Sequence, residues 1–341
     1  MKIVRTVTIF LIIASAVVWA QENSGYHVVV KTLIGGEGGW DYLFVDAGAR
    51  RLYLSHGDHV VVLDADEVKV VGDIPNTQGV HGIAVAPEFH HGFTSNGRSS
   101  TVTIFDLTTL KVIKEVPVSG KNPDAILYDP FSRKLFTFNG RSQDATVLNP
   151  ETGDTLATIF LGGKPEFAVT DFKGHVYVNI EDKSEIAAID AQSNKVATRW
   201  SIAPGEEPSG LAMDVANRRL FSVCGNKMMV ISDPDSGKVV TSVPIGEGPD
   251  ACKFDPGTNL AFSSNGEGTI TVIREESPTK FVVVETAKTQ LRARTMEIDT
   301  KTHALFTVSA EFGETPKPTP ERPRPRPPII PNTFVVLELQ K

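Results

Sequence analysis

The sequence predicts an all-β protein, a seven-bladed β-propeller whose last blade is closed by the N-terminal strand. Three observations predict this class. A unit of 40 to 44 residues recurs along the chain, each unit holds four short apolar runs separated by turn-forming residues, and an extra run near the N-terminus matches the one that the last unit lacks. Helical repeats would instead show apolar residues at a period of 3.6, which these units do not.

The repeat is clearest in two segments, GKNPDAILYDPFSRKLFTFNG at 120–140 and GEGPDACKFDPGTNLAFSSNG at 246–266. The aspartate after the proline of each segment marks the beginning of a unit. Seven equivalent positions follow at intervals of 40 to 44 residues: Asp41, His81, Asp124, Glu166, Ser209, Asp250 and Arg294. We call these seven residues the markers. Units of this length with four strands each are typical of propeller blades.

The third unit illustrates the four strands, here called a to d in chain order. They are expected at 125–129, 134–139, 144–149 and 155–162, and the segments between them are rich in Asp, Pro, Asn and Gly. Strand c ends in an acidic or amide residue in five units, at Asp64, Asp106, Asn149, Asp190 and Asp233. Such a side chain can accept hydrogen bonds from the following backbone and close the c–d turn.

The two ends of the chain predict how the ring closes. The seventh unit stops after its third strand, TFVVLELQK at 333–341, whereas YHVVVKTLIGG at 26–36 matches a fourth strand such as KVVTSVPIGE at 238–247. We therefore expect residues 26–36 to complete the last blade and to leave no exposed sheet edge.

The first 20 residues have the pattern of a signal peptide. Lys2 and Arg5 precede an apolar run from Val7 to Val18, and the small residue Ala20 comes before polar sequence. We expect cleavage after Ala20, a single propeller domain at 21–341, and a periplasmic or secreted monomer. A membrane-anchored N-terminus is the alternative, and no other segment is long and apolar enough to span a membrane.

The charge of the chain bears on which partners it can bind, and its cysteine content bears on whether it forms a disulfide. The formal net charge is −7 and the repeating units hold no basic block, which argues against a nucleic-acid surface. Cys224 and Cys252 could form a disulfide in an oxidising compartment. Two buried small residues are the alternative.

Three strand-b ends carry a family resemblance: FTSNG at 93–97, FTFNG at 136–140 and FSSNG at 262–266, followed by strands such as TVTIFD and TITVI. This pattern resembles the YVTN repeat of the YncE-like seven-bladed β-propellers and covers essentially the whole mature chain. Units four and seven depart from it, with YVNIED and FTVSAEFGE in place of Asn-Gly. The resemblance implies the fold. The repeat is also similar to that of seven-bladed lactonase-like propellers, which implies an enzyme as the alternative.

In a propeller the first strand of each blade lines the central channel, and the d–a and b–c loops share one face. The markers are therefore expected at the channel mouth, with strand-b ends around them at His56, Asn96, Asn139, Cys224 and Asn265. The predicted ligand-binding residues are Asp41, His56, His81, Asp124, Glu166, Asp250 and Arg294. Carboxylates and histidine that converge there could bind a divalent cation or a small polar ligand. Alternatively, the aspartates cap the d–a turns and the Asn-Gly pairs form tight b–c turns.

One segment breaks the repeat. GETPKPTPERPRPRPPIIPN at 313–332 replaces the short b–c loop of the seventh unit with a proline-rich insertion that carries four cations. Its composition favours extended polyproline II structure that does not join a sheet. It could be a tolerated loop, a docking arm for a partner, or a flap attracted to the acidic mouth.

Two function classes follow. The first is an exported, non-enzymatic propeller that binds a protein, a cell-envelope component or a small ligand at the channel mouth. The alternative is a lactonase-like hydrolase that acts on a sugar lactone, in which His81 with Asp41 or Asp124 would supply the acid–base group. A phosphorylated substrate, or the DNA suggested for some relatives, would be repelled by an acidic mouth.

Overall fold

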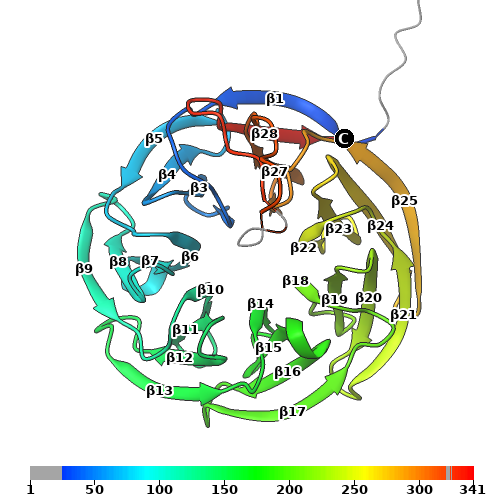
Figure 1. The fold of residues 1–341 in the computed structure, drawn as a ribbon. Coiled ribbons are helices and arrows are strands. Elements are labelled where there is room, and N and C mark those ends of the chain that lie inside the picture. Colours follow the sequence, from blue (N-terminus) through cyan, green and yellow to red (C-terminus); the bar gives the residue numbers. More distant parts are fainter. Residues whose placement is uncertain (1–24, 320–322, 324) are drawn as a thin grey trace, which may run out of the picture.

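The structure, a computed structural model, describes residues 25–319, 323 and 325–341. These residues form seven four-stranded antiparallel sheets arranged as a ring around a central axis (Figure 1). The predicted all-β, seven-bladed propeller is thereby confirmed. The predicted signal peptide lies outside the described residues. Within the described part of the chain, no helix is long and apolar enough to cross a membrane.

The blades follow one another in chain order, each with strand a innermost and strand d on the circumference. Blade 1 consists of β2 (Leu43–Asp46), β3 (Arg51–His56), β4 (His59–Asp64) and β5 (Lys69–Ile74). Blade 2 consists of β6 (Val80–Ala86), β7 (His91–Asn96), β8 (Thr101–Asp106) and β9 (Val112–Pro117). Blade 3 consists of β10 (Pro123–Asp129), β11 (Lys134–Asn139), β12 (Asp144–Leu148) and β13 (Thr155–Phe160).

Blade 4 consists of β14 (Pro165–Thr170), β15 (His175–Ile180), β16 (Glu185–Asp190) and β17 (Lys195–Ser201). Blade 5 consists of β18 (Pro208–Asp214), β19 (Arg219–Cys224), β20 (Met228–Asp233) and β21 (Lys238–Pro244). Blade 6 consists of β22 (Pro249–Asp255), β23 (Leu260–Asn265), β24 (Thr269–Ser277) and β25 (Lys280–Lys288). Two single 3₁₀ turns, η1 (Pro87–Phe89) and η2 (Glu181–Lys183), lie in loops.

Blade 7 joins the two ends of the described chain. Its strands are β26 (Met296–Asp299), β27 (Ala304–Ser309), β28 (Val335–Gln340) and β1 (His27–Leu33). β1 pairs antiparallel with β28, with Val28 opposite Leu339 and Leu33 opposite Val335, and the two strands lie side by side in Figure 1. The predicted closure by residues 26–36 is therefore confirmed.

The core lies between the blades. Strands b and c are buried on both faces, because each face packs on a neighbouring blade, whereas strand d is mainly exposed. The described residues contain a hydrophobic cluster at each of the seven blade junctions. The junction of blades 7 and 1 has its own cluster, which includes the fully buried Phe306, Phe334 and Leu54. The ring is thus held by the same apolar packing all the way round.

The turns follow the sequence interpretation in part. The residues that end strand c close their turns as expected; Asn149, for example, accepts hydrogen bonds from the backbone of Glu151 (2.8 Å) and Thr152 (3.1 Å). The b–c turns are not two-residue Asn-Gly hairpins, since Asn96 pairs with Thr101 and Asn139 with Asp144. These asparagines are buried, and their side chains bind strand c instead.

The structure also shows the state of the two cysteines and the contacts of the proline-rich insertion. Cys224 and Cys252 are free and buried, so the alternative without a disulfide is the right one. The proline-rich insertion is exposed along most of its described length, but its base does join a short antiparallel bridge between Phe312 and Ile329. Phe312 also packs on Trp40, with ring centroids 6.1 Å apart. The expectation that this segment stays out of sheet pairing was wrong at its base, because apolar residues flank the prolines there.

Candidate functional site

A β-bulge places most of the markers. In blades 2 to 6 the pairing of strand a with strand b shifts between the first and fourth residues of strand a, as between Val80 and Ile83 or between Pro123 and Ile126. The marker is the second residue of the strand and falls inside this shift. A bulge leaves its residue outside the regular ladder and re-aims the side chain. The bulge thus turns the markers towards the axis.

Serines of strand b fix the spacing between neighbouring markers. The Ser95 hydroxyl accepts a hydrogen bond from the backbone of Gly82 in its own blade (2.9 Å) and donates one to the backbone carbonyl of Asp124 in the next. Ser264 makes the same pair of contacts, with Ala251 and with the carbonyl of Arg294. Both serines precede the asparagine of the repeat, in FTSNG and FSSNG. They hold adjacent inner strands in register at the mouth.

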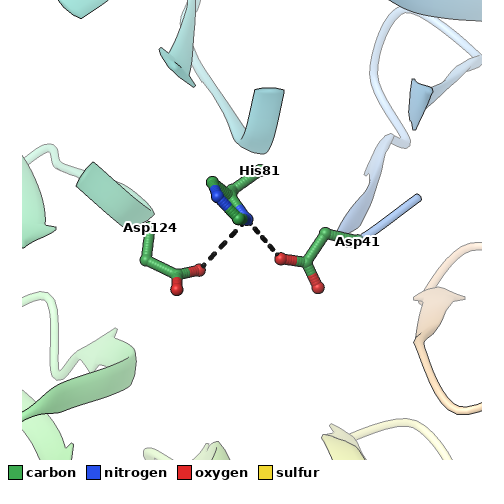
Figure 2. A group of neighbouring side chains, drawn as sticks. All are labelled: Asp41, His81 and Asp124. Carbon is green, nitrogen blue, oxygen red and sulfur yellow. Dashed lines mark hydrogen bonds and ion pairs between the residues drawn. The ribbon is translucent and has the colours of Figure 1, made fainter. Parts of the chain in front are cut away.

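His81 lies between two carboxylates (Figure 2). Its Nδ1 is 2.6 Å from Asp41 Oδ2 and 3.7 Å from Asp124 Oδ1. The ligand atoms of the three residues all lie within 4.8 Å of one another, although the residues come from blades 1, 2 and 3. Asp124 Oδ1 is buried and has no hydrogen-bond partner among the described residues. One imidazole nitrogen and two carboxylates therefore converge on one point.

The contacts continue around the ring. Arg294 joins Asp41, at 3.5 Å, to Asp250, and Asp250 Oδ1 accepts a hydrogen bond from the Ser209 hydroxyl at 2.8 Å. An unbroken series of polar contacts thus runs from Asp124 through His81, Asp41, Arg294 and Asp250 to Ser209. Six of the seven markers belong to it. The structure therefore joins six of the seven markers that the sequence analysis placed at the channel mouth.

The proximity of these charged side chains, together with their burial, shifts the pKa values of four markers. Burial, and then the charge of Asp41, raise the pKa of Asp124 to about 6. Burial and the charge of Asp124 raise the pKa of Glu166 to about 7. Burial alone would lower the pKa of His81, but its hydrogen bond to Asp41 and the nearby carboxylates raise it to about 8. Burial would raise the pKa of Asp41, but His81 and Arg294 outweigh it and hold that pKa below its usual value. His81 is thus mainly protonated at neutral pH.

Two residues of the mouth were missed by the sequence analysis. Lys164 contacts Glu166 at 2.6 Å and also pairs with Glu181 of the same blade, so Arg294 is not the mouth's one fixed cation among the described residues. Tyr42 follows the first marker and contributes a hydrogen bond that lowers the pKa of Asp124. Lys164 lies two residues before its marker, where Arg292 stands in unit seven, so comparing that position between units could have found it.

His56 does not belong to the site. Its side chain is buried, stacks on Phe334 with ring centroids 4.3 Å apart, and meets His59 edge-on. Burial lowers its pKa to about 4, so it is neutral. The structure thus places His56 apart from the contacts that join the markers, because the last residue of strand b is buried between neighbouring blades. Cys224, Asn96, Asn139 and Asn265 are buried for the same reason.

A turn-capping role does not account for the marker carboxylates. In the described part of the chain, no backbone N–H donates to the side chains of Asp41, Asp124, Glu166 or Asp250. Their partners are instead His81, Arg294, Lys164 and the Ser209 hydroxyl. The carboxylates face one another across the mouth, although like charges repel. That arrangement is typical of a site for a cation or a polar ligand.

The fold is shared with proteins of different roles. A chain from the crystal structure of the mitotic checkpoint complex aligns with a TM-score of 0.73 at 12% identity, over 89% of this chain and 95% of its own length. A chain of Kuenenia stuttgartiensis hydrazine synthase aligns with a TM-score of 0.69 at 16% identity, over 82% and 94%. At these identities the likeness concerns the fold alone. No protein-family model and no curated protein matches the sequence.

Proposed function

We propose that the protein is an exported, non-enzymatic propeller that binds a divalent cation at its channel mouth and, through it, a polar ligand or a group of a partner. The observation that carries this proposal is the convergence of Asp41, His81 and Asp124 within 4.8 Å. Export rests on the signal-peptide pattern of residues 1–20 and on the resemblance to exported propellers.

The chemistry of the three ligands favours zinc or manganese over calcium. An imidazole nitrogen suits zinc and similar transition metals, whereas calcium takes six to eight oxygen ligands. Three protein ligands also leave coordination positions open for water or for an outside ligand. A cation would compensate the two carboxylates and give Asp124 Oδ1 a partner, as the His81 proton does in part.

The neighbouring residues suit a polar group on that outside ligand. Arg294 and Lys164 are cations within the same mouth, and both are only partly buried. A hydroxyl- or carboxylate-bearing ligand could therefore bind the metal and a cation together. A protein, a cell-envelope component or a free small molecule could each present such a group. The structural neighbours do not decide among these, because one is part of a multiprotein complex and the other of an enzyme.

Isothermal titration calorimetry of the mature protein with ZnCl₂, MnCl₂ and CaCl₂ tests the proposal. We expect one zinc or manganese ion per chain and weak or undetectable calcium binding. The metal must displace the proton of His81, so about one proton per zinc should be released at pH 7, measurable in two buffers of different ionisation enthalpy.

The matched variants are Asp124→Asn and Asp250→Asn. Asp124→Asn removes a ligand and should abolish zinc binding. Asp250→Asn changes a marker carboxylate that is not one of the three ligands and should leave zinc binding within about threefold, since its charge reaches them only through Arg294. Absence of zinc and manganese binding to the wild type, or equal effects of the two variants, would contradict the proposed site.

A specific observation also favours the hydrolase alternative. Asp41 holds the His81 imidazole at 2.6 Å, an arrangement that orients a general base. Because burial and the surrounding carboxylates set the pKa of His81 at about 8, lactone hydrolysis should increase as the pH rises through 8. Incubation of the metal-free protein with gluconolactone, with His81→Ala as the control, tests this. A rate equal to that of the His81→Ala protein at every pH would reject the alternative.

A further inference from the structure

A separate cavity lies in the channel beneath the mouth. Its volume is about 580 Å³, within the usual range for small-molecule sites. The layer of residues three positions after the markers lines it, and five of the seven are apolar: Phe44, Ala84, Leu127, Val169 and Ala212. None of the charged marker side chains is part of its wall. The channel therefore has a polar mouth and an apolar interior.

An aromatic pair separates the two compartments. Blades 1 and 4 lie on opposite sides of the ring (Figure 1). Tyr42, just before β2 of blade 1, and Phe167, in β14 of blade 4, meet with ring centroids 5.3 Å apart. Lys253 Nζ lies 4.9 Å from the centre of the Phe167 ring. Both aromatic residues belong to the cavity wall and each lies one residue past a marker. The two rings therefore lie between the marker side chains on one side and the cavity on the other.

The cavity opens on the opposite face, at the a–b turns. Its wall ends at exposed turn residues, among them Pro87, Pro130 and Thr300. Phe172 is 56% exposed at this rim, and Phe131 in the neighbouring turn is 49% exposed. Two exposed phenylalanines beside an apolar opening favour an apolar ligand, because such surface gains most from leaving water.

The described wall carries three charged side chains: Glu88 in the turn η1 at the rim, which accepts a hydrogen bond from Tyr128, and the ion pair of Lys253 and Glu297. Lys253 Nζ is 2.8 Å from Glu297 Oε2, and both side chains are largely buried in the wall. Glu297 Oε1 also accepts a hydrogen bond from the backbone of Ile298 at 3.0 Å. Lys253 makes no other hydrogen bond within the described chain, so it has N–H groups to offer. An anionic ligand would be repelled by Glu297 and a cationic one by Lys253, whereas a neutral ligand with an acceptor oxygen meets neither penalty.

We propose that this cavity is a binding site for a neutral, largely apolar small molecule that carries a carbonyl oxygen. The molecule enters from the a–b turn face, buries its apolar body against the inner strands and accepts a hydrogen bond from Lys253. Apolar cavities are poorly hydrated, so such a ligand displaces little well-bound water. The site is independent of the metal site at the mouth.

Two fluorescent probes of stated chemistry test the proposal. Prodan is a neutral aromatic ketone, and diphenylhexatriene is a hydrocarbon without an acceptor. We expect saturable binding of both, one per chain, with blue-shifted prodan emission. The pair variant Lys253→Met with Glu297→Gln removes the ammonium without leaving an unpaired carboxylate. It should weaken prodan binding about tenfold, the equivalent of one charged hydrogen bond, and leave diphenylhexatriene binding unchanged.

Blocking variants and a surface control complete the test. Ala212→Phe, or Val169→Phe if the first does not fold, fills the cavity and should abolish binding of both probes. Phe160→Ser removes a phenylalanine that is 73% exposed on the outer strand β13 and should change neither. The proposal is overturned if the wild type binds no probe saturably, or if binding survives in a folded blocking variant.

Discussion

Protonation of His81 reduces the repulsion between two carboxylates at the channel mouth. Asp41 and Asp124 lie on either side of its Nδ1, and a protonated imidazole compensates both carboxylates. The folded state therefore binds this proton more tightly than the unfolded chain does. Asp124 and Glu166 also retain protons to higher pH than free carboxyl groups, for which burial is the main cause. All three groups change stability in the same direction with pH.

The expected result is a protein that becomes less stable as the pH rises from 6 to 8.5. The pKa of His81 is raised from 6.5 to about 8 and that of Glu166 from 4.5 to about 7, so stability present at pH 6 is lost as each group deprotonates. We predict a fall in the melting temperature of a few degrees in metal-free buffer, measured by scanning calorimetry.

Asp124→Asn provides the comparison for this prediction. Without that carboxylate the pKa values of His81 and Glu166 move towards their ordinary values, so the fall in melting temperature should become smaller. Glu275, whose pKa burial raises to about 7, contributes to the slope from outside the mouth and remains as background in both proteins. A slope that is the same in the variant and the wild type would show that the mouth does not control it.

At the scale of elements, strand a is the part of each blade in which local structure serves the site. In blades 2 to 6 its bulge aims the marker at the axis, and the residues after the bulge line the channel interior. The period and the turn residues of the sequence were enough to place the strands, since every blade repeats them. The bulge was not predictable, because a one-residue shift in pairing leaves no signature in a strand of seven residues. The same limit explains why the Asn-Gly turns proved longer than expected.

The proline-rich insertion divides into two parts with different expected effects. Its base is the bridged pair of Phe312 and Ile329. The Phe312 ring contacts Trp40, and the Arg292 guanidinium lies 4.9 Å from the centre of that ring. Replacing residues 314–327 with Asn-Gly keeps this base and should leave the melting temperature within about two degrees of the wild type, because the described residues of this stretch are mainly exposed and bury little.

Phe312→Ala is the matched variant, since it removes packing at the base and keeps the rest of the insertion. We expect it to lower the melting temperature by a few degrees, as the loss of an aromatic contact would. Differential scanning calorimetry of both variants makes the comparison. If the loop replacement destabilised the protein more than Phe312→Ala did, the exposed part of the insertion would have to pack on the propeller.

At the scale of the whole molecule, the seven blades and their closure followed from the sequence, whereas the division of the channel did not. Tyr42 and Phe167 lie on units one and four, and no pattern within a unit indicates that they meet across the axis. Contacts of this kind depend on the diameter of the ring and on side-chain length, which a repeat does not encode. The sequence therefore indicated one polar funnel where the structure has a polar mouth above an apolar cavity.

Because β1 completes blade 7 by pairing with β28, we expect a separate peptide with the sequence of β1 to complete a chain that lacks it. A chain beginning at residue 37 should aggregate or lose cooperative unfolding, because β28 and the core at the junction of blades 7 and 1 become exposed. A synthetic peptide of residues 26–36 should restore a monodisperse protein, measured by light scattering.

Two peptide variants serve as matched controls. Val30 packs on the apolar core at the junction of blades 7 and 1, whereas Val29 is 44% exposed. A Val30→Asp peptide should therefore fail to rescue, and a Val29→Asp peptide should rescue as well as the unmodified one. Rescue by both, or a truncated chain that unfolds cooperatively alone, would mean that β1 is dispensable for the ring.

The pairing of β1 with β28 also sets the order in which the ring can be completed as the chain emerges into the compartment where it folds. Blades 1 to 6 are each built from consecutive strands, so each can form once its own residues have emerged. Blade 7 cannot, since its outer strand is synthesised first and its neighbour β28 last. Until those last residues emerge, the nascent chain is an open arc with two unpaired flanks. This interval is when the chain is most exposed to misassociation with other nascent chains and most in need of a chaperone.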